Sequence, residues 1–240
     1  MPGLFRVKIM HAESKAIVEK KMKQAAEQAE SWINAGEKFL EHISSFSDSP
    51  TARYALLAEA AEHYQNSLNY LPRKDQGRIR IKLLQIYKDI LLLAKQLSLP
   101  GLSQITTNCR DQMKHQLAYF PPSSLSPETQ AKRMRDPDDL PGLAERYFYH
   151  ACYQYFVGSH HAACGKKYQA AFAFQVGQRY YQHQQALIRH YHRANEKSDA
   201  QKIIFYFDPD MQKILSTMKG RAVEPADRIK HIPHSPKPFR

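Results

Sequence analysis

The chain has 240 residues, of which 42% are hydrophobic and 24% charged, as in an ordinary globular protein that buries a core without disulfides. Its 3 cysteines are too few for a disulfide framework, which favours a reducing, cytoplasmic compartment, and no apolar run approaches the roughly 18 residues of a membrane span, so we expect a soluble protein. The formal net charge of +12 predicts affinity for an acidic protein, a nucleic acid or an anionic membrane surface, with a basic but inert surface as the alternative.

The first predicted element is a long helix that begins near Ala12 and ends in the turn-forming sequence SSFSDSP. The segment before it does not resemble a signal peptide, because Arg6 and Lys8 interrupt its apolar residues. Within the helix, apolar residues recur at alternating spacings of four and three, which places them along one face. They are Val18, Met22, Ala25, Ala29, Trp32, Gly36, Phe39 and Ile43.

Three more helices are predicted before residue 120. They cover Ala52–Leu71, Ile79–Leu97 and Ser103–Ala118, with Ser103 as the N-cap of the last one. A proline and the sequence RKDQG separate the first two of these helices. Together with the long helix, they form a predicted N-terminal helical subdomain of residues 1–120.

Prolines then crowd the chain, and we predict a proline-rich connector at residues 121–142 with one helical turn at Glu128–Met134. A C-terminal helical subdomain is predicted at residues 143–218. Its first helix covers Leu143–Val157, and the following Gly158 and Ser159 are expected to form a turn.

A longer helix is predicted to begin near His160. Ile203–Phe207 then fits either a buried helix end or a short strand. Asp208 and Pro209 match an N-cap followed by a proline at the first helical position, and they open a last helix. Residues 219–240 hold four prolines and little apolar material, so we expect a flexible basic tail. The four-three spacing and the small number of glycines, 9 in all, predict an all-α fold.

The stretch YHACYQYFVGSHHAACGKKY, residues 149–168, carries cysteines and histidines that suit zinc. Cys152, His160 and Cys164 are the weak candidate ligands. Structural zinc sites usually bring ligands in pairs two to four residues apart, whereas these cysteines are twelve residues apart. His161 would point about 100° away from His160 on a helix. Packing between helices is therefore the favoured interpretation, and no metal or cofactor is predicted.

The order of large and small residues in this stretch is typical of two antiparallel helices that pack closely against each other. One helix face would carry Phe148, Ala151, Cys152 and Tyr155, and a face of the next helix would carry Cys164, Tyr168 and Ala171. This spacing resembles the tetratricopeptide repeat, a helix-turn-helix unit of about 34 residues. The proline that often ends the repeat is missing, because Val176 holds its place.

A looser echo of the same repeat lies in the N-terminal half. Trp32 and Gly36 resemble its first helix, and Ala60, Tyr64 and Pro72 resemble its second. The intervening segment is longer than in the family, so the helices would be elongated. The resemblance implies a short helical-repeat array, and a generic antiparallel helical bundle is the alternative.

One segment, residues 146–195, contains no Asp or Glu. Arginines, lysines and histidines are interleaved there with aromatic residues, which suits an anionic ligand, although cations that only cover tyrosine rings would give the same pattern. The candidate anion- or partner-binding residues are Lys166, Lys167, Arg179, His183, Arg189, His190 and Arg193.

The sequence contains no catalytic, phosphate-binding or named nucleic-acid-binding motif, so an enzyme is not the favoured class, although catalysis stays open. We expect a non-enzymatic helical protein-interaction module or adaptor that binds an acidic protein or peptide in a groove or on its basic face. Its size, helicity and charge also resemble those of bacterial effectors delivered into a host cytosol. The alternative is binding of nucleic acid or anionic lipid through residues 146–195.

Overall fold

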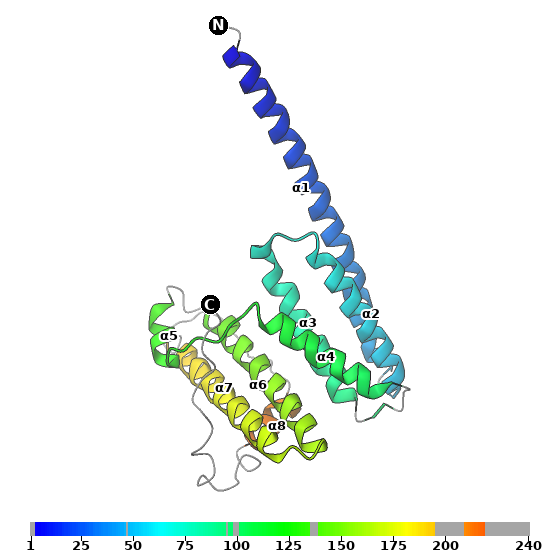
Figure 1. The fold of residues 1–240 in the computed structure, drawn as a ribbon, viewed down its shortest axis with the longest axis vertical. Helices are drawn as coiled ribbons and strands as arrows, with labels where there is room; N and C mark the ends of the chain where they lie inside the picture. Colours follow the sequence, from blue (N-terminus) through cyan, green and yellow to red (C-terminus); the bar gives the residue numbers. More distant parts are fainter. Residues whose placement is uncertain are drawn as a thin grey trace. The chain divides into compact units, whose positions relative to one another are not determined.

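The computed structural model describes the backbone of residues 3–46, 48–94, 96–97, 101–134, 139–194 and 209–218, and side chains from residue 17 onward except that of Pro209. The predicted all-α fold is confirmed. These residues form eight α-helices and two short 3₁₀ helices, and none of them lies in a strand (Figure 1). The segment Ile203–Phe207, predicted as a helix end or a strand, and the predicted tail at residues 219–240 lie outside the described residues.

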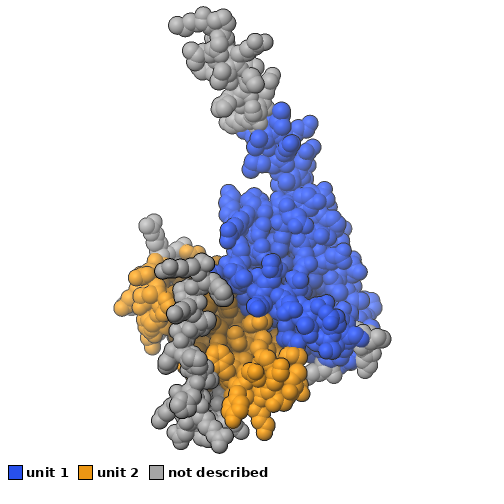
Figure 2. All heavy atoms as spheres, in the orientation of Figure 1, with its two compact units in different colours: residues 1–121 blue, residues 122–240 orange. Residues whose placement is uncertain are grey.

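The chain divides into two compact units, Met1–Pro121 and Pro122–Arg240 (Figure 2). Unit 1 contains four α-helices, and consecutive helices pack against one another. Their bounds are α1 Gly3–Glu41, α2 Pro50–Leu68, α3 Gln76–Leu93 and α4 Leu102–Leu117, with 3₁₀ helices at Ile43–Phe46 and Arg73–Asp75.

The ends of these helices follow local chemistry. Ser49 caps α2, because its hydroxyl accepts a hydrogen bond from the amide of Ala52 at 3.3 Å. The N-cap of α4 is Gly101 with φ 73°, so the expectation that Ser103 caps this helix is wrong. A positive φ suits glycine, which has no Cβ to clash.

α1 is longer than expected, since it begins at Gly3 rather than near Ala12, and it extends well beyond the end of α2 (Figure 1). Its apolar row becomes buried at Ala29, which is 1% exposed. Further along, a Cβ atom at Gly36 would lie 3.2 Å from the ring of Tyr64. The missing side chain therefore lets α1 approach α2 closely.

Unit 2 contains the other four helices. Their bounds are α5 Pro127–Arg133, α6 Leu140–Ala163, α7 Lys167–Ala194 and α8 Pro209–Ser216. α6 and α7 form the main packed pair, while α5 and α8 both contact α7 (Figure 1). Pro209 opens α8, as expected for a proline at the first helical position.

The predicted turn at Gly158 and Ser159 is wrong, because α6 continues to Ala163 and the chain turns at Gly165, where φ is 70°. Gly158 serves a different purpose. A Cβ atom there would lie 2.6 Å from the Cε1 atom of Phe174 in α7, so the ring lies directly against the α6 backbone. The long helix consequently begins at Lys167 and not near His160.

Candidate partner-binding surface on α7

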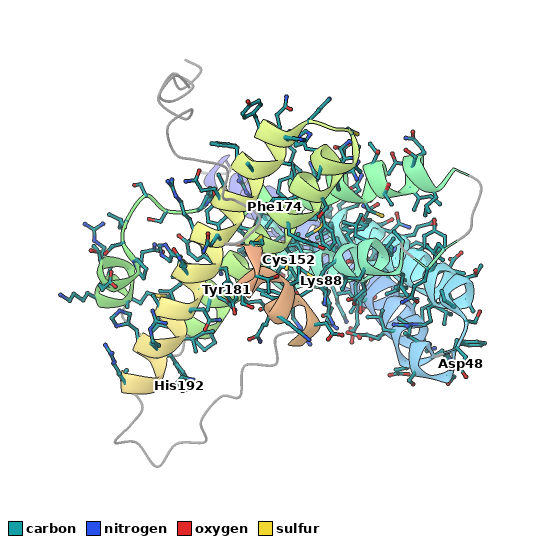
Figure 3. All side chains as sticks on the ribbon, turned by 90° about the horizontal axis from the view of Figure 1, so that it is seen from below. Asp48, Lys88, Cys152, Phe174, Tyr181 and His192 are labelled. Atoms are coloured by element: carbon teal, nitrogen blue, oxygen red, sulfur yellow. The ribbon has the colours of Figure 1, made fainter. Side chains whose placement is uncertain are left out.

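The inner faces of α6 and α7 are closely packed. Phe148, Ala151, Cys152 and Tyr155 are all buried, as the packing interpretation of the sequence requires. From α7, Gly177 lies close to α6, because a Cβ atom there would lie 3.0 Å from the Cβ atom of Gln154 and 3.3 Å from the backbone oxygen of Ala151. Cys152 and Phe174 are labelled in Figure 3, and both are buried side chains of this pair.

The predicted partners of that face on the next helix do not fill it. Cys164 is exposed after the end of α6, and Tyr168 is 65% exposed on α7. The expectation that these two residues face α6 is therefore wrong. The buried residues of α7 in this region are Ala170, Ala173 and Phe174.

The weak metal candidates are not brought together. Cys152 is fully buried, whereas Cys164 lies twelve residues further along the same stretch, about 18 Å away at helical rise. His160 and Cys164 do approach each other, with Nε2 and Sγ 3.8 Å apart. Within the part of the chain that the structure describes, no group of three or more metal-ligating side chains forms.

The face of α7 that points away from α6 carries a row of residues at spacings of four and three. We call it the α7 outer row: Tyr168, Phe172, Gln175, Arg179, Gln182, Ala186, Arg189 and Arg193. Six of its members, the two aromatic residues, the three arginines and Gln182, are exposed, whereas Ala186 is buried. Tyr168 and Phe172 are 65% and 56% exposed and lie one helical turn apart.

The structure thus places three of the predicted cations, Arg179, Arg189 and Arg193, in one exposed line. Lys166 and Lys167 are exposed at the start of α7, beside the aromatic end of the row. Within the described residues, none of the three arginines forms an ion pair. Their guanidinium groups are available to a carboxylate or a phosphate.

His183 is not part of this exposed line. Its ring stacks on that of Tyr147, with centroids 4.1 Å apart, and its Nε2 lies 2.8 Å from the amide nitrogen of Gln130. The same Gln130 amide donates to the hydroxyl of Tyr147 at 3.1 Å. Burial lowers the pKa of His183, although the carboxylate of Glu128 acts in the opposite direction.

His190 is placed beside an acidic residue that sequence reasoning missed. Its Nε2 lies 3.9 Å from a carboxylate oxygen of Glu128 in α5. A hydrogen bond from its own backbone amide, and then one with Ser126, hold the pKa of Glu128 below its ordinary value, and His190 adds to this effect. The acid-free segment is therefore not acid-free in space, because α5 brings Glu128 to its edge.

Comparisons with protein-family models, with curated proteins and with solved structures found no match to this chain. In the described part of the chain, no helix combines the length and the apolar character needed to cross a membrane. The α7 outer row carries exposed aromatic rings at one end and exposed arginine side chains toward the other.

Proposed function

We propose that this chain is a non-enzymatic helical interaction protein that binds an acidic protein or peptide through the α7 outer row. One observation carries the proposal: Arg179, Arg189 and Arg193 share an exposed line on a helix that has no acidic residue of its own. A solvated helix normally mixes both signs of charge, so a one-signed line favours a binding role over a merely soluble surface.

The choice of residue also supports an anionic partner. Arginine presents a planar fork of donors that can engage a carboxylate through two parallel hydrogen bonds. The neutral amide of Gln175 lies between the aromatic pair and Arg179, and that of Gln182 lies between Arg179 and Arg189; both amides can donate and accept hydrogen bonds. No carboxylate of α7 competes with a ligand for these groups.

Binding of nucleic acid or anionic lipid through the same surface is the second candidate. Exposed Tyr168 and Phe172, close to Lys166 and Lys167, favour it, since aromatic rings stack on bases and also enter the membrane interface. The two candidates predict different ligands for one surface, so the same variants test both.

The test is a triple variant, Arg179→Gln with Arg189→Gln and Arg193→Gln, which keeps helix propensity nearly unchanged. Its binding to polyglutamate, to a single-stranded oligonucleotide and to phosphatidylserine vesicles would be compared with that of the wild type. A matched control replaces exposed Lys20, Lys21 and Lys114 with Gln, because it changes the net charge equally but in unit 1. We expect polyglutamate binding to weaken in the arginine variant and to persist in the lysine variant. Equal loss in both variants would mean that only net charge matters, and the proposal would fail.

A further inference from the structure

The turn that joins α6 to α7 is exposed along its whole length. Residues 162–169, with the sequence AACGKKYQ, are all exposed. α8 contacts α7 further along, because a Cβ atom at Gly177 would lie 3.2 Å from the Cε atom of Met218, just after α8. We call residues 162–172 the hairpin tip, which comprises the end of α6, the turn and the start of α7 (Figure 1). It presents a convex surface rather than a groove.

The backbone of this turn is hydrogen-bonded internally. The amide of Gly165 donates to the carbonyl oxygen of Ala162 at 3.0 Å, and that of Lys166 donates to the carbonyl oxygen of His161 at 2.8 Å. With Gly165 at φ 70°, these two bonds form the Schellman motif that closes a helix. The amide of Lys167 then donates to the carbonyl oxygen of Gly165 at 3.0 Å. Such a turn can leave water at low cost, because few backbone groups lose a partner in an apolar medium.

The side chains of the hairpin tip are apolar, aromatic, basic or neutral, and none is acidic. Tyr168 and Phe172, 65% and 56% exposed, lie four residues apart, so both rings project from the same side of α7. Lys166 and Lys167 come directly before them. Lysine stems can lie along apolar surface while the ammonium group stays in water. Aromatic rings beside lysines match the interface of an anionic bilayer, where rings lie among the headgroups and cations attract the lipid charge.

The acidic residues of the helices packed nearest to this turn lie far along the pair. Glu145, the one acidic residue of α6, precedes Ala162 by about 26 Å at helical rise. Glu128 of α5 approaches α7 at His190, about 27 Å beyond Phe172. Both distances exceed the Debye length of about 8 Å at physiological salt, so these two carboxylates do not cancel the attraction of the lysines.

The small side chains of the turn favour a membrane over a nucleic acid. Ala162, Ala163 and Cys164 are exposed on the α6 side and extend the apolar surface away from the two rings. They offer a polynucleotide neither a cation nor a stacking surface, whereas the boundary of the lipid acyl chains accepts small apolar groups.

We infer that the hairpin tip enters the interface of an anionic lipid membrane. Tyr168 and Phe172 lie among the lipid headgroups, and Lys166 and Lys167 stay beside the phosphates. The tip shares its two aromatic residues with the α7 outer row but needs none of the arginines, so the inference goes beyond the proposed function. Two rings and two lysines give weak, reversible attachment rather than stable anchoring.

The experiment measures partitioning of the full chain onto mixed phosphatidylcholine and phosphatidylserine vesicles and onto pure phosphatidylcholine vesicles by co-sedimentation. We expect preference for the mixed vesicles. Tyr168→Gln with Phe172→Gln should lower that partition coefficient about tenfold, because both rings leave the lipid. The matched control, Phe46→Gln with Tyr70→Gln, removes two exposed aromatic residues of unit 1 and should bind like the wild type.

Charge is tested separately. Lys166→Gln with Lys167→Gln should weaken binding by a factor of about five for each lysine. Lys20→Gln with Lys21→Gln lowers the net charge equally at exposed positions of α1 and should have a much smaller effect. Equal loss in both lysine variants would mean that only net charge matters, and the inference would be wrong.

Insertion itself is tested with a fluorescent ring. Phe172→Trp places an indole in the tip, and lipids with brominated acyl chains should quench its emission. Phe46→Trp is the control at an exposed position of unit 1 and should not be quenched beyond the wild type, in which Trp32 is the only tryptophan. Equal quenching of the two variants would contradict insertion of the tip.

The remaining outcomes separate this inference from the proposed function. Polyglutamate binding should be unchanged in the aromatic variant, and its response to the arginine variant tests the proposed function alone. If vesicle binding requires the three arginines but not the tip, the second candidate function holds and the inference is wrong. If the aromatic variant instead dissociates an oligomer of the wild type, or loses affinity for a single-stranded oligonucleotide but not for vesicles, the tip has another occupant and the inference is also wrong. Circular dichroism of each variant confirms that the helices remain intact.

Discussion

At the scale of single residues, glycines decide how closely the helices of each unit approach. Gly36 lies against the ring of Tyr64 in unit 1, and Gly158 lies against the ring of Phe174 in unit 2. A glycine inside a helix normally lowers its stability, by about 0.5–1 kcal/mol relative to alanine. At Gly158 a Cβ atom would clash with the ring of Phe174 at 2.6 Å, whereas at Gly36 it would make a tight contact with the ring of Tyr64 at 3.2 Å.

Gly158→Ala should therefore destabilise the protein although alanine is the better helix former. The added methyl group would lie 2.6 Å from the Cε1 atom of Phe174, and we expect overpacking to lower the free energy of unfolding by about 1–3 kcal/mol. Urea denaturation followed by circular dichroism measures the change. Gly142→Ala is the control in the same helix, since no atom lies within 4 Å of its added Cβ, and it should be neutral or stabilising. Equal effects of the two substitutions would contradict this account.

Cys152 tests the choice between packing and metal binding. It is fully buried between the helices of unit 2, so Cys152→Leu should overpack the contact and lower the free energy of unfolding by about 1–3 kcal/mol. Cys152→Ala should be milder, because it removes only one sulfur atom from the core. Elemental analysis of the purified wild type accompanies the denaturation curves. Stoichiometric zinc, together with a loss of zinc in the alanine variant, would refute the packing interpretation.

At the scale of elements, α5 is attached to α6 and α7 by a polar cluster. Gln130 of α5 contacts both the hydroxyl of Tyr147 and the Nε2 atom of His183. Because the Gln130 amide donates, the histidine nitrogen can accept only when it is unprotonated. The lowered pKa of His183 agrees with a neutral ring in the folded protein.

The docking of α5 should consequently weaken as the pH falls. A histidine whose folded pKa lies below its ordinary value of 6.5 contributes stability that is present above pH 6.5 and is lost as the pH falls through the lowered folded value. The carboxylate of Glu128 raises the pKa of His183, but the lowering by burial is the larger effect. Hydrogen exchange of the α5 amides, corrected for intrinsic rates, should accelerate between pH 7 and pH 5. His183→Gln should abolish this pH dependence of exchange, whereas the control His115→Gln, at an exposed histidine, should retain it. An unchanged pH dependence in the His183→Gln variant would exclude His183 as its source.

Much of this architecture could be predicted from the spacing of apolar residues, but not the register of the α6–α7 pair. A glycine in a turn and a glycine beneath an aromatic ring look alike in sequence, so the turn was expected at Gly158 instead of Gly165. The sequence therefore placed Tyr168 in the contact between the two helices, whereas in the structure it lies on the exposed face. The exposure of the three arginines follows from their positions off the apolar row. The approach of Glu128 to His190 could not be predicted from the sequence, because it depends on how α5 packs against α7.

At the scale of the whole molecule, the net charge of +12 alone predicts weak attraction to any polyanion. The two units differ in how their charges are arranged. α1 in unit 1 contains both acidic and basic residues, which include the ion pair of Lys23 with Glu27, whereas α7 in unit 2 has basic but no acidic side chains. The account therefore assigns binding to one helix face and not to the overall charge.

The salt dependence of polyglutamate binding tests that assignment most directly. Polyglutamate would be titrated into the wild type, the arginine triple variant and the Lys20, Lys21 and Lys114 control at several salt concentrations. Screening weakens exposed ion pairs, so we expect the affinity of the wild type and of the lysine control to fall steeply as salt rises. The arginine variant should bind weakly with a shallow dependence. Identical salt dependence in the wild type and the arginine variant would contradict the claim that the α7 outer row is the binding surface.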